Sequence, residues 1–234
     1  MKKLPTPVTP TYTLKLPSTG ETLSFRPFLT QEEKILLLAL ESEDPEQIKQ
    51  SIIDIITNCT EGKINPRELP VFDIEYIFLQ LRSKSVGETC EPTFELEDEN
   101  GVKHTITLKV PIDDIKVVVP ENHNMDIKLN DELVIRMKYP TIESSMVEGK
   151  TNVEQIFNSI IDCVDTIFYG EEQFDREDLD PSDISEFIDK LERNQFAKLI
   201  DFMNTIPTVE KELDVKVGKK THKIHLKGIQ DFFV

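Results

Sequence analysis

Apolar and polar residues alternate in three stretches of the chain, and each stretch is interrupted by a turn signal. The first covers residues 12–25 and contains a Pro-Ser-Thr-Gly segment. The second covers residues 93–110 and contains an Asn-Gly pair, whose residues suit the positive φ angles of a tight hairpin turn. The third covers residues 213–226 and contains a Gly-Lys-Lys-Thr segment. This pattern predicts β-hairpins near the N-terminus, in the middle of the chain and near the C-terminus.

Helical start signals occur in two blocks between these hairpins. In the first block they lie at Thr30, Asp44-Pro45 and Leu69-Pro70, and in the second at Thr151 and Asp180-Pro181. Both threonines are followed three residues later by Glu, the pattern of a capping box. The Asp-Pro pairs offer a capping side chain and a proline at the first helical position. Five helices are therefore predicted.

The apolar spacing also predicts how far the helices run and which side chains they bury. It carries the helix from Thr151 through Phe168, and the last helix from Asp180 to Phe202. We expect the five helices to share one core. Its expected members are Ile52, Ile56, Phe72, Tyr76, Phe157, Ile160 and Leu191.

Strands and helices are segregated along the chain rather than alternating, which predicts an α+β fold. The expected architecture is a helical core built from two helical blocks, with N-terminal, middle and C-terminal β-hairpins. Residues 1–10 contain three prolines and are predicted to form an extended arm. Residues 11–234 are predicted to form a single domain, with a β-rich insertion at about 88–138.

Charge and composition exclude several classes of protein. The 234 residues include 27 Lys and Arg against 44 Asp and Glu, a net charge of −17. That balance argues against binding to nucleic acid or to an anionic membrane surface. The apolar runs are shorter than the ~20 residues of a membrane span, and the N-terminus does not resemble a signal peptide. We therefore expect the three cysteines to be free thiols in a reducing compartment.

Signals for catalysis or for a cofactor are weak throughout the sequence. There is no phosphate-binding loop, dinucleotide fingerprint or nucleophile elbow. His222 and His225 are three residues apart on a predicted strand, so they should point to opposite faces. Cys90 lacks the second close thiol of a zinc knuckle. We expect no catalytic residue, no metal and no cofactor, although a Cys–His pair that meets only in space stays open.

The densest charge cluster lies between Glu171 and Asp189, where nine residues are acidic. A calcium loop would need Gly and Glu at positions that Asp183 and Asp189 occupy, so a solvated acidic stretch is the better interpretation. Such a stretch could receive a basic partner surface. Its candidate interface residues are Asp175, Asp178 and Asp180. Mimicry of DNA is a further interpretation of the charge, but lysines are interspersed over most of the chain.

The chain ends on Phe232, Phe233 and Val234, which are the other candidate interface residues. Exposed aromatic side chains at a chain end would form an apolar patch, and such patches mark contacts. Two alternatives are open. The tail folds back onto the core of its own domain, or it inserts into a neighbouring protein as an aromatic anchor.

Four segments of the sequence, taken in order, resemble a known family. They are residues 16–34 (Leu-Pro-Ser-Thr-Gly, then Phe-Arg-Pro-Phe-Leu and Glu-Glu-Lys), residues 69–88, residues 135–140 and residues 226–233. We call them the signature segments. From about residue 11 to the C-terminus, the chain resembles the baseplate hub subunit and hub-assembly family of T-even-type contractile-tailed bacteriophages.

The resemblance implies a non-enzymatic structural or assembly protein of the central tail hub. Its expected partners are other phage baseplate hub and tail proteins, with no nucleic acid, membrane or small-molecule substrate. Its expected location is the virion tail, after assembly in the host cytoplasm. Two alternatives remain open: a transient hub-assembly chaperone absent from the mature virion, and an enzyme with an unrecognised site.

Overall fold

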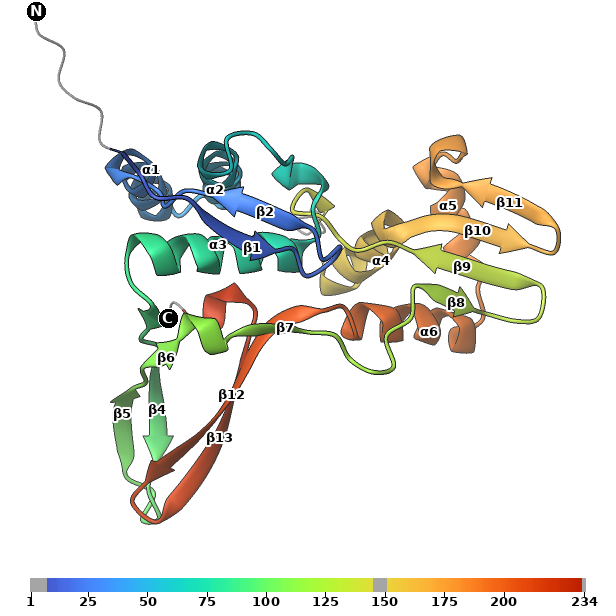
Figure 1. Cartoon of the computed structure of the whole chain (residues 1–234). Helices are drawn as coiled ribbons and strands as arrows, with labels where there is room; N and C mark the ends of the chain where they lie inside the picture. Colours follow the sequence, from blue (N-terminus) through green and yellow to red (C-terminus); the bar gives the residue numbers. More distant parts are fainter. Residues whose placement is uncertain (1–7, 145–150, 233–234) are drawn as a thin grey trace, which may run out of the picture. The chain divides into compact units, whose positions relative to one another are not determined.

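The structure is a computed structural model that describes residues 8–144 and 151–232. The chain forms two compact units, one from residues 1–118 and 208–234 and the other from residues 119–207. We call them unit 1 and unit 2. In Figure 1, unit 2 carries the colours from green-yellow to orange-red, and unit 1 contains both the blue start and the red end of the chain.

The helical part of unit 1 follows a short antiparallel hairpin. Its elements are β1 (Tyr12–Lys15), β2 (Thr22–Phe25), α1 (Thr30–Ser42), α2 (Pro45–Cys59), η1 (Pro66–Glu68) and α3 (Val71–Ser85). α2 contacts both α1 and α3. The hairpin and the start of α2 agree with the sequence prediction, since Asp44 caps α2 by accepting the N–H of Glu46 at 3.0 Å.

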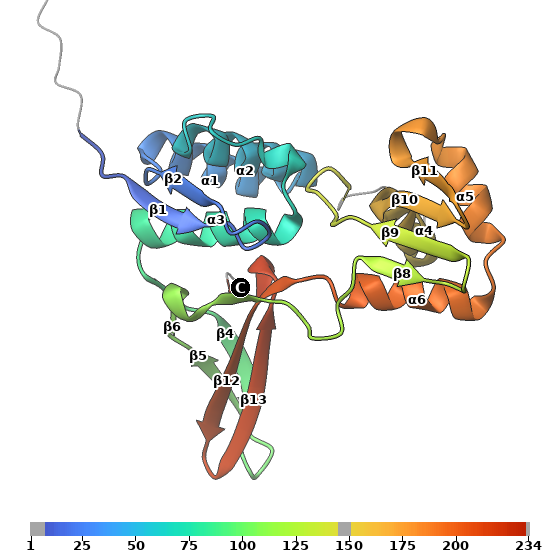
Figure 2. The ribbon, with the colours of Figure 1, turned by 45° about the vertical axis from the view of Figure 1, so that its right-hand side comes forward.

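The strand-rich part of unit 1 is assembled from two distant stretches of the chain. Its elements are β3 (Thr89–Cys90), β4 (Thr93–Glu97), β5 (Lys103–Thr107), β6 (Val110–Pro111), η2 (Ile112–Asp114), β7 (Lys116–Val118), β12 (Thr208–Val217), β13 (Lys220–Lys227) and η5 (Ile229–Phe232). β12 pairs with both β13 and β7, while β4 pairs with β5 and β3 with β6. The middle and C-terminal hairpins are therefore confirmed, and Figure 2 shows them extending together from the helices of unit 1.

In its described residues, unit 2 is a four-stranded antiparallel sheet with three α-helices. Its elements are β8 (Asp126–Lys128), β9 (Leu133–Met137), α4 (Asn152–Cys163), β10 (Val164–Tyr169), β11 (Glu172–Asp175), η4 (Arg176–Asp178), α5 (Pro181–Asp189) and α6 (Arg193–Asn204). The strand order is β11-β10-β9-β8. With unit 1, this arrangement confirms the α+β class.

The predicted extent of the helix from Thr151 is wrong. Its start is confirmed, because Thr151 and Glu154 form the predicted capping box, but α4 ends at Cys163 and the chain continues as β10. Val164, Ile167 and Phe168 have a spacing that fits a helix. Their β-branched and aromatic side chains also favour a strand, and pairing with β9 and β11 decides the outcome.

The predicted last helix is two helices. α5 ends at Asp189 and α6 begins at Arg193, so the apolar spacing continues across a break that it does not reveal. Glu192 and Gln195 form a capping box that starts the second helix. The carboxylate and amide groups satisfy backbone N–H groups that a continuous helix would have bonded internally.

The shared core predicted for all five helices is also wrong. α4, α5 and α6 contribute to a core cluster made only of unit 2 residues, whereas α1, α2 and α3 belong to unit 1. Hydrophobic spacing shows that a helix has a buried face, but not which element covers it. Of the seven predicted core residues, Ile56, Phe72 and Ile160 are buried, and the other four are partly buried.

Two predicted segments, the N-terminal arm and the β-rich insertion, can be compared with the described residues. Most of the predicted arm at residues 1–10 lies outside the described residues, and residues 8–10 have no regular secondary structure. The β-rich stretch at about 88–138 is divided, with β3 to β7 in unit 1 and β8 and β9 in unit 2. Within the described part of the chain, none of the helices has the length and apolar content that a bilayer span requires.

Candidate functional site

Two of the signature segments meet at the first turn of α3. The backbone N–H of Ser18 donates to Asp73 Oδ1 at 3.0 Å, and the Ser18 hydroxyl donates to the same carboxylate. Asp73 is fully buried, and burial raises the pKa of its carboxyl, although the two hydrogen bonds from Ser18 oppose that rise. A buried carboxylate held by a turn fixes the β1–β2 hairpin on α3.

Further hydrogen bonds connect three of the four signature segments within unit 1. The N–H of Phe28 donates to Ser85 Oγ at 2.9 Å, and the N–H of Ile229 donates to Glu75 Oε1 at 3.2 Å. Burial raises the pKa of the Glu75 carboxyl, and the bond from Ile229 opposes the rise. The fourth segment, residues 135–140, lies in unit 2 and includes part of β9. The signature residues of unit 1 therefore specify its fold rather than an exposed site.

A partly buried ion pair stabilises the start of α1. Arg26 Nη2 lies 2.8 Å from Glu32 Oε1, and the second oxygen of Glu32 accepts the N–H of Leu29 at 2.8 Å. Burial alone would raise the pKa of Glu32, but the bonds from Arg26 and Leu29 outweigh it and the pKa is lowered. The predicted capping box paired Thr30 with Glu33. In the structure, Glu32 is the residue that accepts a backbone N–H at the helix start, and the donor is Leu29.

The three cysteines are free thiols, as the sequence predicted, and all three are buried. Burial raises the pKa of Cys59 to about 11 and that of Cys163 to about 12, and it also raises the pKa of Cys90. These thiols are protonated at neutral pH, and the thiolate is the nucleophilic form of cysteine.

The two C-terminal histidines have separate partners, in agreement with the prediction that they face opposite ways. His222 Nε2 lies 2.7 Å from the carbonyl oxygen of Glu97, and His225 Nε2 lies 2.9 Å from Glu210 Oε2. Within residues 8–144 and 151–232, no three His, Cys, Asp or Glu side chains are grouped closely enough to hold a metal ion.

Of the predicted C-terminal interface residues, the structure describes Phe232. Its side chain is 1% exposed and belongs to a core cluster of unit 1 that also contains Leu79 and Leu226. Phe232 therefore follows the first alternative, folding back onto its own core, and we do not propose it as an interface residue. Phe233 and Val234 lie outside the described residues.

The acidic interface candidates, Asp175, Asp178 and Asp180, lie within six residues of one another in unit 2. Asp175 ends β11 and accepts hydrogen bonds from Thr166 Oγ1 at 3.2 Å and Gln173 Nε2 at 2.8 Å. Asp178 is exposed in η4, and Asp180 caps α5 by accepting the N–H of Ser182 at 2.9 Å. The carboxylates of Asp175 and Asp180 therefore organise local structure, while Asp178 and Asp180 are exposed to solvent.

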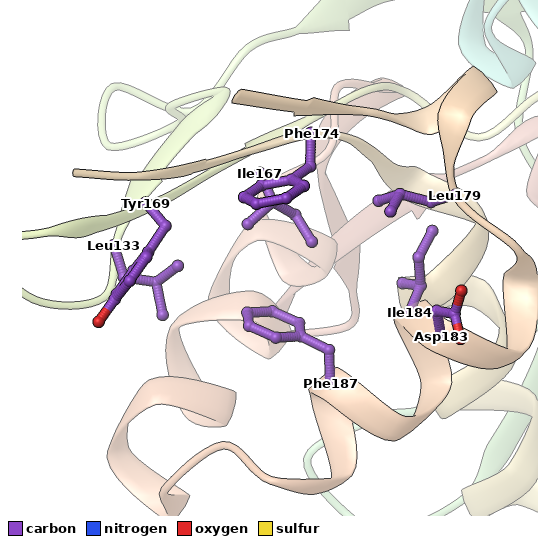
Figure 3. Close-up of a pocket in the computed structure, with 8 residues that line it drawn as sticks. All are labelled: Leu133, Ile167, Tyr169, Phe174, Leu179, Asp183, Ile184 and Phe187. Carbon is purple, nitrogen blue, oxygen red and sulfur yellow. The ribbon is translucent and has the colours of Figure 1, made fainter. Parts of the chain in front are cut away.

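An apolar pocket of about 370 Å³ lies beside these acids, between the sheet of unit 2 and α5. Figure 3 shows the aromatic rings of Phe174 and Phe187 pointing toward one another across it. Leu179 and Ile184 complete one side, and Asp183 is the charged side chain in the lining. The pocket opens to solvent, because Phe174 is 38% exposed.

Strand pairing explains why the sheet side of this pocket is apolar. Ile167 of β10 is paired with Phe174 of β11, and Tyr169 of β10 is paired with Leu133 of β9. Residues two apart on a strand share a face, so all four side chains line one surface. The pocket was not predicted, because the apolar spacing places Ile167 on a helix. The available signal was the pair of aromatic stretches on either side of Gly170, which is a hairpin pattern.

A family model described as T4 bacteriophage base plate protein matches residues 9–234. Searches of curated proteins and of solved structures gave no match. Because the family model covers nearly the whole sequence, the chain belongs to this baseplate family, which confirms the resemblance at the level of a T4-type baseplate protein. Membership indicates a structural protein of the phage baseplate, located in the virion tail and in contact with other tail proteins.

Proposed function

We propose that this baseplate protein is a component of the central hub, where it acts through protein–protein contacts and catalyses no reaction. The observation that carries the proposal is the ordered set of four signature segments. Within the wider baseplate family, that set resembles the hub subunit and hub-assembly proteins of contractile-tailed phages.

Two features of the molecule support a role through contacts. Its signature residues in unit 1 are occupied in holding the fold together, as the Ser18–Asp73 and Phe28–Ser85 hydrogen bonds illustrate. The surface of unit 2 presents an open apolar pocket next to a strongly acidic stretch, a combination suited to binding another protein.

The location can be tested by quantitative mass spectrometry of purified particles, isolated baseplates and infected-cell lysate. Tails disassembled into a central hub fraction and a peripheral baseplate fraction should contain this chain in the hub fraction, at constant stoichiometry to the other hub proteins. Recovery in the peripheral fraction alone would overturn the hub assignment.

The same measurement separates a resident component from a transient assembly factor. A resident protein is retained in finished virions. A hub-assembly chaperone would be found in complexes from the lysate and be absent from finished particles. An uncomplexed chain in lysate and its absence from particles would contradict both.

A further inference from the structure

We propose that the apolar pocket of unit 2 is a docking site for a basic protein segment, which inserts one aromatic or large aliphatic side chain between Phe174 and Phe187 and places Lys or Arg side chains over the surrounding acids. This inference rests on the proposed function only in requiring that the protein works through contacts with other proteins.

The shape and lining of the pocket fit a side-chain anchor. Its volume of about 370 Å³ is near the lower end of the range of about 300–1,000 Å³ for ligand pockets. Seven of its eight lining residues are apolar or aromatic. Tyr169 and Phe174 at the opening are 52% and 38% exposed, so an inserted side chain would cover apolar surface that now faces water.

Acidic residues adjoin the pocket lining on two of its sides. Leu179 lies between Asp178 and Asp180 in the chain, and Asp183 of α5 lines the pocket itself. Tyr169 is paired across the strands with Glu172. The rim of the pocket therefore carries negative charge on both the sheet side and the side of η4 and α5.

The segment that supplies β11, η4 and α5 has an unbalanced charge. Residues 171–189 contain nine acidic residues and one basic residue, Arg176, for a net charge of −8 out of the −17 of the whole chain. Lys190 neutralises one of these acids, since its Nζ lies 2.7 Å from Glu186 Oε1. The remaining excess favours a cationic partner and raises its association rate.

This charge selects the occupant. An uncharged small molecule would gain nothing from the acidic rim. A second copy of this chain carries the same −17 charge and would be repelled. A segment with an apolar anchor between basic residues satisfies both the lining and the rim.

The test uses the full chain, labelled with nitrogen-15, and three synthetic peptides in NMR titrations. The peptide Lys-Lys-Leu-Phe-Lys-Lys carries both the anchor and the charge. Lys-Lys-Gly-Ser-Lys-Lys carries the charge alone, and Glu-Glu-Leu-Phe-Glu-Glu carries the anchor alone. We expect saturable shifts of the β10, β11 and α5 amides with the first peptide, and at least tenfold weaker binding of the other two.

Substitutions identify the surface. Phe174→Ser removes an exposed wall of the pocket, and we expect about tenfold weaker binding of the first peptide. Leu38→Ser, which alters an exposed leucine of α1 in unit 1, is the matched control and should change nothing. Asp178→Lys should also weaken binding and reduce its salt dependence. Glu121→Lys, an exposed acid of unit 2 that does not line the pocket, is its control.

Three outcomes would overturn the proposal. If the basic and acidic anchor peptides bind equally tightly, the acidic rim does not select a basic segment. If the wild type does not bind the first peptide, or if Phe174→Ser binds it as tightly as the wild type does, the pocket is not the docking site. A dimer in sedimentation that Phe174→Ser dissociates would assign the pocket to a second copy of the chain. None of these results alters the particle composition, so the hub assignment is tested separately.

Discussion

At the scale of single residues, Gly218 shows how one position can depend on a contact far away in sequence. Its φ is +61°, and a Cβ at this position would collide with the Glu99 carboxylate. That carboxylate accepts the N–H of Lys219 at 2.9 Å and so connects the turns of the two long hairpins of unit 1.

We therefore expect Gly218→Ala to destabilise the protein more than Gly101→Ala. Gly101 has a φ of +78° with open space around its Cα, so its substitution costs only the left-handed backbone conformation, about 1–2 kcal/mol. Urea unfolding of both variants measures the difference. Adding Glu99→Ala should make the two losses equal, and a difference that persists would contradict the role assigned to Glu99.

The Arg26–Glu32 pair makes a second residue-scale prediction, with a defined pH dependence. Glu32→Gln leaves a largely buried guanidinium without its counter-charge, and we expect a loss of about 2–3 kcal/mol in the free energy of unfolding at neutral pH. Glu33→Gln, on the exposed side of α1, is the control and should change little.

The sign of the pH effect follows from the lowered pKa of Glu32. Its ordinary value is 4.5, so its stabilisation is fully present above that pH and is lost as the pH falls through the lower pKa of the folded state. The difference between wild type and Glu32→Gln should therefore shrink on acidification. A difference that grows at low pH would mean that the Arg26 contact does not stabilise the charged carboxylate.

At the scale of elements, the sequence predicted helix starts, which depend on neighbouring residues, better than strands, which depend on partners elsewhere in the chain. The caps at Asp44, Thr151 and Asp180 each use a side chain and an N–H within three residues, so the sequence contains the whole interaction. β10 was assigned wrongly because its partners, β9 and β11, are outside the segment itself. The same error hid the pocket, since the pairing of Ile167 with Phe174 creates its apolar wall.

The capping box of α4 gives the first element-scale prediction. Thr151 Oγ1 accepts the N–H of Glu154 at 3.2 Å, and Glu154 Oε2 accepts the N–H of Thr151 at 3.0 Å. We expect Thr151→Ala to lower the unfolding free energy of unit 2 by about 1 kcal/mol. Thr151→Ser keeps the hydroxyl and should retain most of the stability in the same denaturation experiment, which separates capping from loss of the methyl group.

The packing of η5 on the core of unit 1 gives the second element-scale prediction. Phe232 is 1% exposed beside Leu79 and Leu226, so Phe232→Ala should cost about 3–5 kcal/mol. Phe174→Ala, which removes a phenylalanine that is already 38% exposed, should cost much less. Thermal unfolding of both variants compares them. Similar losses would show that the C-terminal ring contributes no more to packing than a surface ring.

At the scale of the whole molecule, the chain leaves unit 1 after β7, builds unit 2, and returns to unit 1 at β12. The returning strand pairs with β7, where Thr208 lies opposite Val118. Hydrophobic spacing could not predict this return, because pairing between residues so distant in sequence leaves no local pattern. The single shared core expected from the sequence followed from treating all apolar helix faces as equivalent.

We expect the two units to lose stability independently, because the buried residues around Ile160 in unit 2 and those around Leu79 in unit 1 belong to different core clusters. Ile160 is fully buried in the unit 2 cluster and Leu79 is 1% exposed in a unit 1 cluster, so alanine at either position should cost about 2–5 kcal/mol within its own unit. Hydrogen exchange measured by mass spectrometry should then respond reciprocally. Ile160→Ala should speed exchange in α4, α6 and β9 while α3 keeps its protection, and Leu79→Ala should do the reverse. If each variant weakened protection in both units by the same factor, the two cores would unfold as one cooperative structure and the division at residues 118 and 208 would have no energetic meaning.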